Sequence, residues 1–279
     1  MQVNARKSCV GRQRRVDVGG FSNLNDVLRA YGEGNIFGEA HGDGPVQVLW
    51  LHGWARTSAN FSAAAALLAR DGIASVALDL PGCGASPLPS SAGGSALYAR
   101  ILEPVLAQFG ATPLVLVGHS NGGRVATSLT LAHPERVKAL VLSGAPLIRL
   151  DRARRSPVAY RWVRVLHGRG LVGEARMEAA RQKYGSRDYR NATGLLREIL
   201  VASVNENFES QLDQIIAPVS LVWGANDRDV PLEVAQRISA GLVHSTRVEL
   251  DVLPETGHLV PSEQPAELSA RVRRLVVGP

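Results

Sequence analysis

One serine in this sequence stands where a strand should turn sharply into a helix. Ser120 is the centre of the run GHSNGG (118–123), which follows an apolar stretch and precedes a segment with helical periodicity. Small residues on either side, Gly118 and Gly122, permit a tight turn that lifts the serine Oγ clear of a sheet. The N-terminus of the following helix favours developing negative charge. The pattern therefore predicts that Ser120 is a nucleophile.

A serine hydroxyl is a weak nucleophile that needs an adjacent base, and a carboxylate must hold that base in one tautomer. Asp227 and His258 each follow an apolar run downstream of Ser120, in the order serine, acid, histidine. Ligand sites of open α/β sheets form at the carboxyl ends of the strands. We predict Asp227 as the acid and His258 as the base, with Asp229 as the alternative acid because it lies slightly farther from the strand end.

The first strongly apolar run, VQVLWL, ends in the residues His52, Gly53 and Trp54. A tetrahedral intermediate requires N–H donors for its oxyanion. We predict the backbone N–H groups of Trp54 and Asn121 for this role. Gly53 and His119 are counted with His52 as supporting residues, and His52 is expected to brace its loop by hydrogen bonding and not to titrate in catalysis.

Short β-branched runs alternate with segments of helical period, which predicts an α/β protein with a mostly parallel central sheet and helices on both faces. The predicted strands cover 46–51, 73–80, 113–118, 137–144, 219–224 and 247–253. The predicted helices cover 59–70, 95–109, 121–132, 232–241 and 265–276.

No strand pattern occurs between 147 and 213, which predicts a helical cap inserted into a core formed by 21–146 and 214–279. This segment contains thirteen Arg plus Lys and eight Asp plus Glu, a surplus of +5 in a chain whose net charge is +6. Two interpretations stay open. The arginines could bind an anionic group of the substrate, since guanidinium pairs with carboxylate or phosphate in bidentate fashion, or they could form a solvated helical surface.

Composition limits the class of protein. Residues 1–20 are basic and no apolar stretch follows them, which predicts a mobile tail on a cytoplasmic protein and not a signal peptide. Two cysteines, Cys9 and Cys83, do not suggest a disulfide framework or a metal cluster. No apolar run is long enough to cross a bilayer. No nucleic-acid motif accompanies the basic charge, so a nucleic-acid partner is not expected.

Several further motifs accompany GHSNGG. They are HGW (52–54), DLPGCGAS (79–86), HPERVKALVLSGAP (133–146), WGANDRDVP (223–231) and GH (257–258). With them the chain resembles the α/β-hydrolase superfamily from about residue 38 to residue 277. The HGW and elbow motifs are most similar to those of small carboxylesterases, including the pimeloyl-ester hydrolases of biotin synthesis.

The resemblance implies that 147–213 covers the pocket. From the residues we predict hydrolysis of a carboxylic ester of a small to medium-sized molecule, and we expect a monomer or homodimer. No cofactor or metal is needed for this chemistry. The same residues support a carbon–carbon bond hydrolase acting on a vinylogous diketone, a cyclase or a perhydrolase. A ligand-binding receptor that turns over slowly is another alternative. Nucleic-acid binding through the tail and cap is a third, and it predicts strongly salt-dependent retention on DNA.

Overall fold

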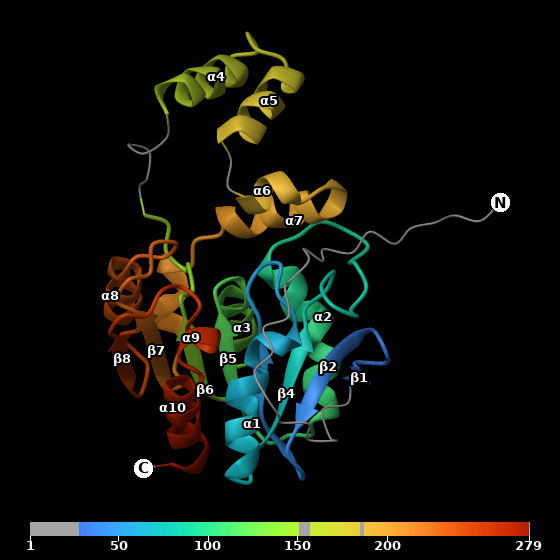
Figure 1. Ribbon diagram of the computed structural model, residues 1–279, viewed down its shortest axis with the longest axis vertical. Helices are drawn as coiled ribbons and strands as arrows, with labels where there is room; N and C mark the ends of the chain where they lie inside the picture. Colours follow the sequence, from blue (N-terminus) through green and yellow to red (C-terminus); the bar gives the residue numbers. More distant parts are fainter. Residues whose placement is uncertain (1–27, 151–156, 185–186, 279) are drawn as a thin grey trace, which may run out of the picture.

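The computed structural model describes residues 28–150, 157–184 and 187–278, so the predicted basic tail lies outside the described residues. Eight strands of the described chain form one sheet in the order β1-β2-β4-β3-β5-β6-β7-β8 (Figure 1). The pairs β1–β2 and β2–β4 are antiparallel, and every other pair is parallel. The predicted mostly parallel sheet is confirmed.

All six predicted strands are present, with ends within one residue of the expected ones. They are β3 Val46–Leu51, β4 Ala74–Asp79, β5 Leu114–His119, β6 Val137–Ser143, β7 Val219–Gly224 and β8 Val248–Leu253. Strands β4, β5 and β7 are buried along their whole length because helices cover both faces of the sheet.

Two strands at one edge of the sheet were not predicted. They are β1 Leu28–Tyr31 and β2 Ile36–His41, which form a hairpin whose second strand pairs with β4. Three of the four residues of β1 are exposed, and in β2 only Ile36, Gly38 and His41 are buried. Because neither strand has the continuous apolar character of a doubly covered strand, the pattern that located the other six did not find them.

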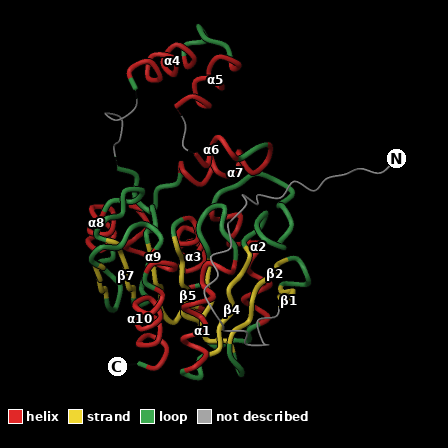
Figure 2. Tube along the Cα trace, viewed as in Figure 1, coloured by secondary structure: helices red, strands yellow, loops and turns green. Residues whose placement is uncertain are grey.

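The helices form two layers, one on each face of the sheet (Figure 2). The helices and short turns of this core are η1 Ser58–Phe61, α1 Ser62–Arg70, α2 Ser95–Gln108, α3 Asn121–Ala132, η2 Pro134–Arg136, α8 Leu232–Gly241, α9 Val260–Glu263 and α10 Pro265–Val277. Buried residues of α2, α3 and α8 belong to one apolar cluster, and those of α1, α9 and α10 belong to the other. Helices therefore cover both faces, as predicted.

The secondary-structure elements that the structure describes between β6 and β7 are all helical. They are α4 Val158–Gly168, α5 Glu174–Tyr184, α6 Arg187–Asn191, α7 Gly194–Asn205 and the short 3-10 helix η4 Glu209–Gln214. Helices α6 and α7 lie between the sheet and the α4–α5 pair (Figure 1). No helix of the described chain is long and apolar enough to span a membrane.

The two ends of this helical region are held together and packed into the main core. Leu147 and Phe208 are buried in the larger apolar cluster, and the Phe208 N–H donates to the Leu147 carbonyl over 2.8 Å. The Arg124 guanidinium of α3 donates to the Pro146 carbonyl through Nε (3.1 Å) and Nη2 (2.9 Å). We propose that the cap proper begins after Ile148 and ends before Phe208, since the flanking residues belong to the core.

Candidate active site

The turn between β5 and α3 holds Ser120 in a backbone conformation that few residues adopt. Its φ is 51° and its ψ is −118°, and a positive φ at a residue other than glycine costs free energy that the surrounding structure must offset. The Ser120 N–H donates to the Ser143 carbonyl at the end of β6 (2.8 Å), and the Ser120 carbonyl accepts the Gly123 N–H (3.0 Å). These bonds fix the turn at the carboxyl edge of the sheet.

The predicted glycines allow three backbone segments to approach one another around this turn. A Cβ atom on Gly122 would lie 1.9 Å from the Leu51 carbonyl oxygen, and one on Gly118 would lie 2.5 Å from the backbone at the start of α3. A Cβ atom on Gly53 would lie 3.2 Å from the Ser120 Cβ. A side chain at Gly118 or Gly122 would displace the serine turn, and one at Gly53 would crowd it.

A chain of hydrogen bonds joins the three predicted triad residues. His258 Nε2 lies 3.0 Å from Ser120 Oγ, and His258 Nδ1 lies 2.8 Å from Asp227 Oδ2. The other carboxylate oxygen of Asp227 accepts the backbone N–H groups of Asp229 (2.9 Å) and Val230 (2.8 Å). Asp227 is 7% exposed. The carboxylate that bonds to His258 thus belongs to Asp227 and not to Asp229. The backbone N–H of Asp229 instead donates to the Asp227 carboxylate.

Backbone hydrogen bonds also join the loop of the acid to the loop of the histidine. The Ala225 N–H donates to the Leu253 carbonyl and the Asn226 N–H donates to the Thr256 carbonyl, each over 2.9 Å. These two loops follow β7 and β8, which are parallel neighbours in the sheet. The pairing of the strands therefore continues into the loops and sets the spacing between the carboxylate and the imidazole.

Gly144 is a residue of the site that the sequence motifs contained but to which they gave no role. It follows β6 with a φ of 54°, a conformation that favours glycine. A Cβ atom at this position would lie 2.9 Å from His258 Cε1 and Nδ1, and 3.3 Å from Asp227 Oδ2. Glycine is therefore needed here both for the backbone angle and for the close approach of the acid and the imidazole.

Glu263 of α9 is a second residue that the sequence did not indicate. Its Oε2 accepts the Gly257 N–H (2.6 Å) and its Oε1 accepts the Leu259 N–H (3.0 Å). These two amides flank His258 on both sides. Hydrogen bonds from backbone N–H groups to a carboxylate are among the stronger hydrogen bonds of proteins. Glu263 therefore fixes the backbone that carries the histidine.

We expect Glu263→Ala to lower kcat by about tenfold with little change in KM, because a small misplacement of a reacting group costs rate and not ground-state binding. Steady-state hydrolysis of a 4-nitrophenyl ester measures this effect. Glu255→Gln is a matched control, since it removes one negative charge from an exposed position in the same loop. A Glu263→Ala enzyme with the wild-type kcat would contradict the role of Glu263 as a positioning residue.

Two buried histidines support the site without carrying charge at neutral pH. His52 Nδ1–H donates to the Gly53 carbonyl (2.8 Å) and Nε2 accepts the Leu80 N–H (2.9 Å), while burial lowers the pKa of His52 to about 4. His119 Nδ1–H donates to the Ser143 carbonyl (3.1 Å), and burial is the main reason that the pKa of His119 falls to about 3. Both rings therefore brace the loops that surround Ser120.

The low pKa values of these histidines predict how stability depends on pH. A histidine in the unfolded chain takes up a proton near its ordinary pKa of 6.5, whereas His52 and His119 in the folded protein do so only near pH 4 and pH 3. Their contribution to the free energy of unfolding is thus fully present above pH 6.5 and is lost progressively as the pH falls below it.

Urea unfolding at pH 7.5 and pH 5.0 measures this dependence. We expect His119→Asn to shrink the loss of stability between the two pH values, because the substitution removes one of the protons taken up on unfolding. His244→Asn is the control, since His244 is exposed. An equal loss of stability in the wild-type and His119→Asn proteins would refute the explanation.

The loop after β3 presents the first of the two predicted oxyanion donors. The Arg56 N–H donates to the Gly53 carbonyl over 3.2 Å and closes the turn that carries Trp54. Asn121 is the first residue of α3, directly after the serine. Within the described part of the chain, no hydrogen bond to another protein group uses the N–H of Trp54 or of Asn121. Both amides are therefore available to a substrate oxygen.

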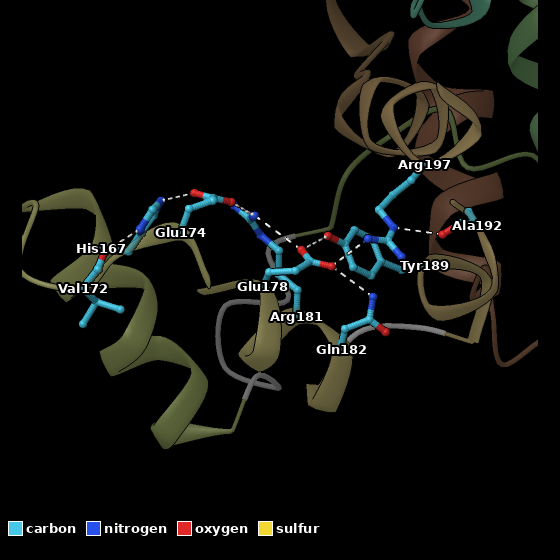
Figure 3. Close-up of polar contacts among 9 residues, drawn as sticks. All are labelled: His167, Val172, Glu174, Glu178, Arg181, Gln182, Tyr189, Ala192 and Arg197. Carbon is cyan, nitrogen blue, oxygen red and sulfur yellow. Dashed lines mark hydrogen bonds and ion pairs between the residues drawn. The ribbon is translucent and has the colours of Figure 1, made fainter. Parts of the chain in front are cut away.

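Ion pairs and hydrogen bonds connect the helices of the cap (Figure 3). Glu178 of α5 accepts hydrogen bonds from Tyr189 Oη of α6 and from Arg197 Nη1 of α7, each over 2.7 Å. Arg181 forms an ion pair with Glu174 of its own helix. Because Arg181 and Arg197 already have carboxylate partners, part of the positive surplus of the cap serves the structure of the cap itself.

Comparison with known proteins agrees with this architecture. The family described as the alpha/beta hydrolase fold matches residues 47–165. A 2-hydroxy-6-oxononadienedioate/2-hydroxy-6-oxononatrienedioate hydrolase of Klebsiella pneumoniae is 32% identical over 243 residues, which cover 78% of this chain and 82% of that protein. The chain belongs to the α/β-hydrolase family, as the sequence motifs predicted, and it is a hydrolase.

Solved structures share the fold at low sequence identity. An esterase from Exiguobacterium antarcticum aligns with a TM-score of 0.67 at 20% identity, covering 90% of this chain and 99% of that one. A 2-hydroxy-6-oxo-6-phenylhexa-2,4-dienoate hydrolase from a Rhodococcus species aligns with a TM-score of 0.65 at 20% identity, with the same coverage. These two structures support the fold, and one is named as an esterase and the other as a hydrolase of a dienoate.

Proposed function

We propose that this protein hydrolyses carboxylic esters of small molecules by acyl transfer to Ser120. The observation that carries the proposal is the continuous hydrogen-bonded chain from Ser120 Oγ through His258 to the Asp227 carboxylate, with distances of 3.0 and 2.8 Å. This chain starts at a serine held at a positive φ between a strand and a helix. Such an arrangement activates a hydroxyl that is otherwise unreactive.

In the first half of the reaction, Ser120 Oγ attacks the carbonyl carbon while His258 Nε2 accepts the hydroxyl proton. The Asp227 carboxylate stabilises the resulting imidazolium through its bond to Nδ1–H. The carbonyl oxygen becomes an oxyanion, to which the N–H groups of Trp54 and Asn121 donate. The intermediate collapses, the ester C–O bond breaks, and the leaving alcohol takes the proton from His258 Nε2.

In the second half, water attacks the acyl-enzyme and transfers a proton to His258 Nε2. The same N–H groups bind the second oxyanion, and its collapse releases the carboxylic acid and returns the proton to Ser120 Oγ. The pKa of His119, lowered to about 3 mainly by burial, keeps the ring beside His258 neutral throughout. A neutral neighbour does not oppose the positive charge that His258 carries in each half.

Cleavage of a carbon–carbon bond is the second candidate, because the relative from Klebsiella pneumoniae is named as a hydrolase of a 2-hydroxy-6-oxo dienedioate. That reaction also includes attack on a carbonyl group before the carbon–carbon bond breaks, so the same serine, histidine and oxyanion donors would serve it. It differs from ester hydrolysis in its leaving group, which is a carbon atom that must be protonated. The two candidates therefore share the site and differ in substrate.

A panel of substrates distinguishes the candidates. We expect 4-nitrophenyl esters of short acids to be hydrolysed with a higher kcat/KM than a 2-hydroxy-6-oxo-dienoate of similar size, with thioesters and anilides included for comparison. Loss of the activity in Ser120→Ala shows that the observed hydrolysis belongs to this site. Fast consumption of the dienoate with no ester turnover would replace the proposal with the second candidate.

A further inference from the structure

One face of helix α4 is apolar and exposed to solvent. Val158, Trp162 and Val165 recur at helical spacing, so their side chains form a single apolar stripe along the helix. These three residues are 65%, 62% and 42% exposed. The Leu171 N–H donates to the Leu166 carbonyl (2.9 Å), which folds the chain back at the end of α4, and Leu171 is 71% exposed. Large apolar side chains that gather on a surface in this way are typical of a site that binds a partner or a membrane.

The apolar stripe faces away from α5. On the other side of α4, the Tyr160 ring lies 5.9 Å from the Tyr184 ring of α5, centre to centre. His167 Nε2 lies 3.1 Å from a carboxylate oxygen of Glu174. Tyr160 precedes Trp162 by two residues, a rotation of about 200° around the helix, so the two side chains point to opposite sides. The α4–α5 pair lies at the end of the described chain farthest from the sheet (Figures 1 and 2). The stripe is therefore accessible to a broad, flat surface.

Arginines border this stripe. Arg161 and Arg164 of α4 and Arg169, directly after the helix, are exposed. Residues 157–173 contain no aspartate or glutamate. A helix with tryptophan and aliphatic side chains on one face and arginines beside them is typical of a helix that lies in the interface of a membrane. There the apolar side chains enter the headgroup region and the arginines pair with anionic lipids. The charge around the stripe is therefore complementary to an anionic membrane surface.

We propose that α4 binds the surface of an anionic phospholipid bilayer, with the apolar stripe and Leu171 in the headgroup region and the three arginines beside the phosphates. The helix has 11 residues and is too short to cross a bilayer, so it lies along the surface. A second copy of this chain fits the same face poorly. A symmetric contact would bring the arginines of both copies together, and residues 157–173 supply no acidic partner for them. Binding of this kind does not depend on the chemistry at Ser120.

Co-sedimentation of the full chain with vesicles tests the proposal. Vesicles of equal parts of phosphatidylglycerol and phosphatidylcholine are compared with vesicles of phosphatidylcholine alone, at low and at high salt. Two double variants probe the two parts of the surface. Trp162→Ser with Leu171→Ser removes apolar side chains, and Arg161→Gln with Arg164→Gln removes charge. Both variants keep residues 1–20, so any attraction of the basic tail to the vesicles is the same in each.

Matched double variants on the core serve as controls. Val243→Ser with Val277→Ser removes two apolar side chains from residues that are 67% and 61% exposed. Arg29→Gln with Arg100→Gln removes two exposed arginines, one from β1 and one from α2. The melting temperature of each variant, followed by circular dichroism, distinguishes a loss of binding from a loss of the fold.

We expect the wild type to bind the anionic vesicles, and to bind less at high salt because salt screens the attraction between arginines and phosphates. Trp162→Ser with Leu171→Ser should lower the partition coefficient by about tenfold or more, because burial of large apolar side chains drives insertion. Arg161→Gln with Arg164→Gln should lower it by about tenfold or more, since each arginine near the surface contributes about fivefold. Both controls should stay within about twofold of the wild type, because charges far from the bilayer are screened.

Fluorescence of Trp162 provides a second readout. The difference between the emission of the wild type and of Trp162→Phe isolates this residue from the other tryptophans. We expect this emission to shift to the blue when anionic vesicles are added and to be quenched by lipids with a spin label in the acyl chain. Equal binding by the wild type and by Trp162→Ser with Leu171→Ser, or an unchanged Trp162 emission, would overturn the proposal. A dimer that this double variant converts to a monomer, with no vesicle binding by the wild type, would also overturn it and assign the face to a second copy.

Discussion

Ser120→Ala is expected to lower kcat/KM for a short 4-nitrophenyl ester by about four to six orders of magnitude. The substitution removes the only atom that forms a covalent bond to the acyl group in the proposed reaction. What remains is the rate due to the oxyanion donors and to binding, which is typically about 10³-fold above the rate in water. Initial rates at a high enzyme concentration measure the residual activity.

The control for this variant is Ser128→Ala, which removes a serine hydroxyl from α3, the helix that follows Ser120. Ser128 Oγ lies 2.8 Å from Ser95 Oγ, on the side of α3 that faces α2. We expect this variant to keep the activity within a few-fold of the wild type. Wild-type turnover by Ser120→Ala would refute the assignment of the nucleophile, whichever substrate is used.

Asp227→Asn is expected to lower kcat by about three to four orders of magnitude with a smaller effect on KM. The amide can occupy the position of the carboxylate, but it can donate a hydrogen bond to His258 Nδ1, and this stabilises the wrong tautomer of the ring. The amide also has no charge to stabilise the imidazolium. The pH dependence of kcat and the residual rate both report this change.

Asp229→Asn is the matched control for the acid. Its N–H bonds to Asp227 Oδ1, so the backbone contact survives the substitution of its side chain. We expect activity within a few-fold of the wild type. A large loss in Asp229→Asn together with an active Asp227→Asn would reverse the assignment and make Asp229 the acid.

The sequence predicted most of the sheet and the order of the site residues for one physical reason. Strands that are covered on both faces must be apolar throughout, so β4, β5 and β7 are visible as continuous apolar runs. Because parallel strands end at a common edge, polar residues directly after such runs gather there. This is how residues as distant as Ser120 and His258 could be assigned to one site.

Other features depend on contacts that no local pattern records. The β1–β2 hairpin is largely exposed along its outer strand, and its pairing with β4 is a long-range contact. Glu263 accepts the N–H groups on both sides of His258 because the turn of α9 brings it back to that loop. In the sequence it cannot be told from an ordinary surface glutamate. The need for glycine at position 144 becomes clear only in the structure, where a Cβ atom at this position would lie too close to the His258 imidazole.

The number of charged residues in the cap likewise does not tell which of them are paired with one another. The count of arginines between 147 and 213 left open whether they bind an anion or form a solvated helical surface, whereas two of them, Arg181 and Arg197, pair with glutamates of the cap. Only the placement of each guanidinium in the structure shows that these two arginines are already paired.

Labelling with a fluorophosphonate, followed by peptide mapping, tests whether Ser120 is the nucleophile. The reagent reacts with a serine only when a base and an oxyanion site activate it. We predict one adduct per chain, located on Ser120, with a loss of ester hydrolysis that follows the fraction labelled. An adduct on another residue, or full hydrolytic activity in completely labelled protein, would contradict the assignment of Ser120 as the nucleophile.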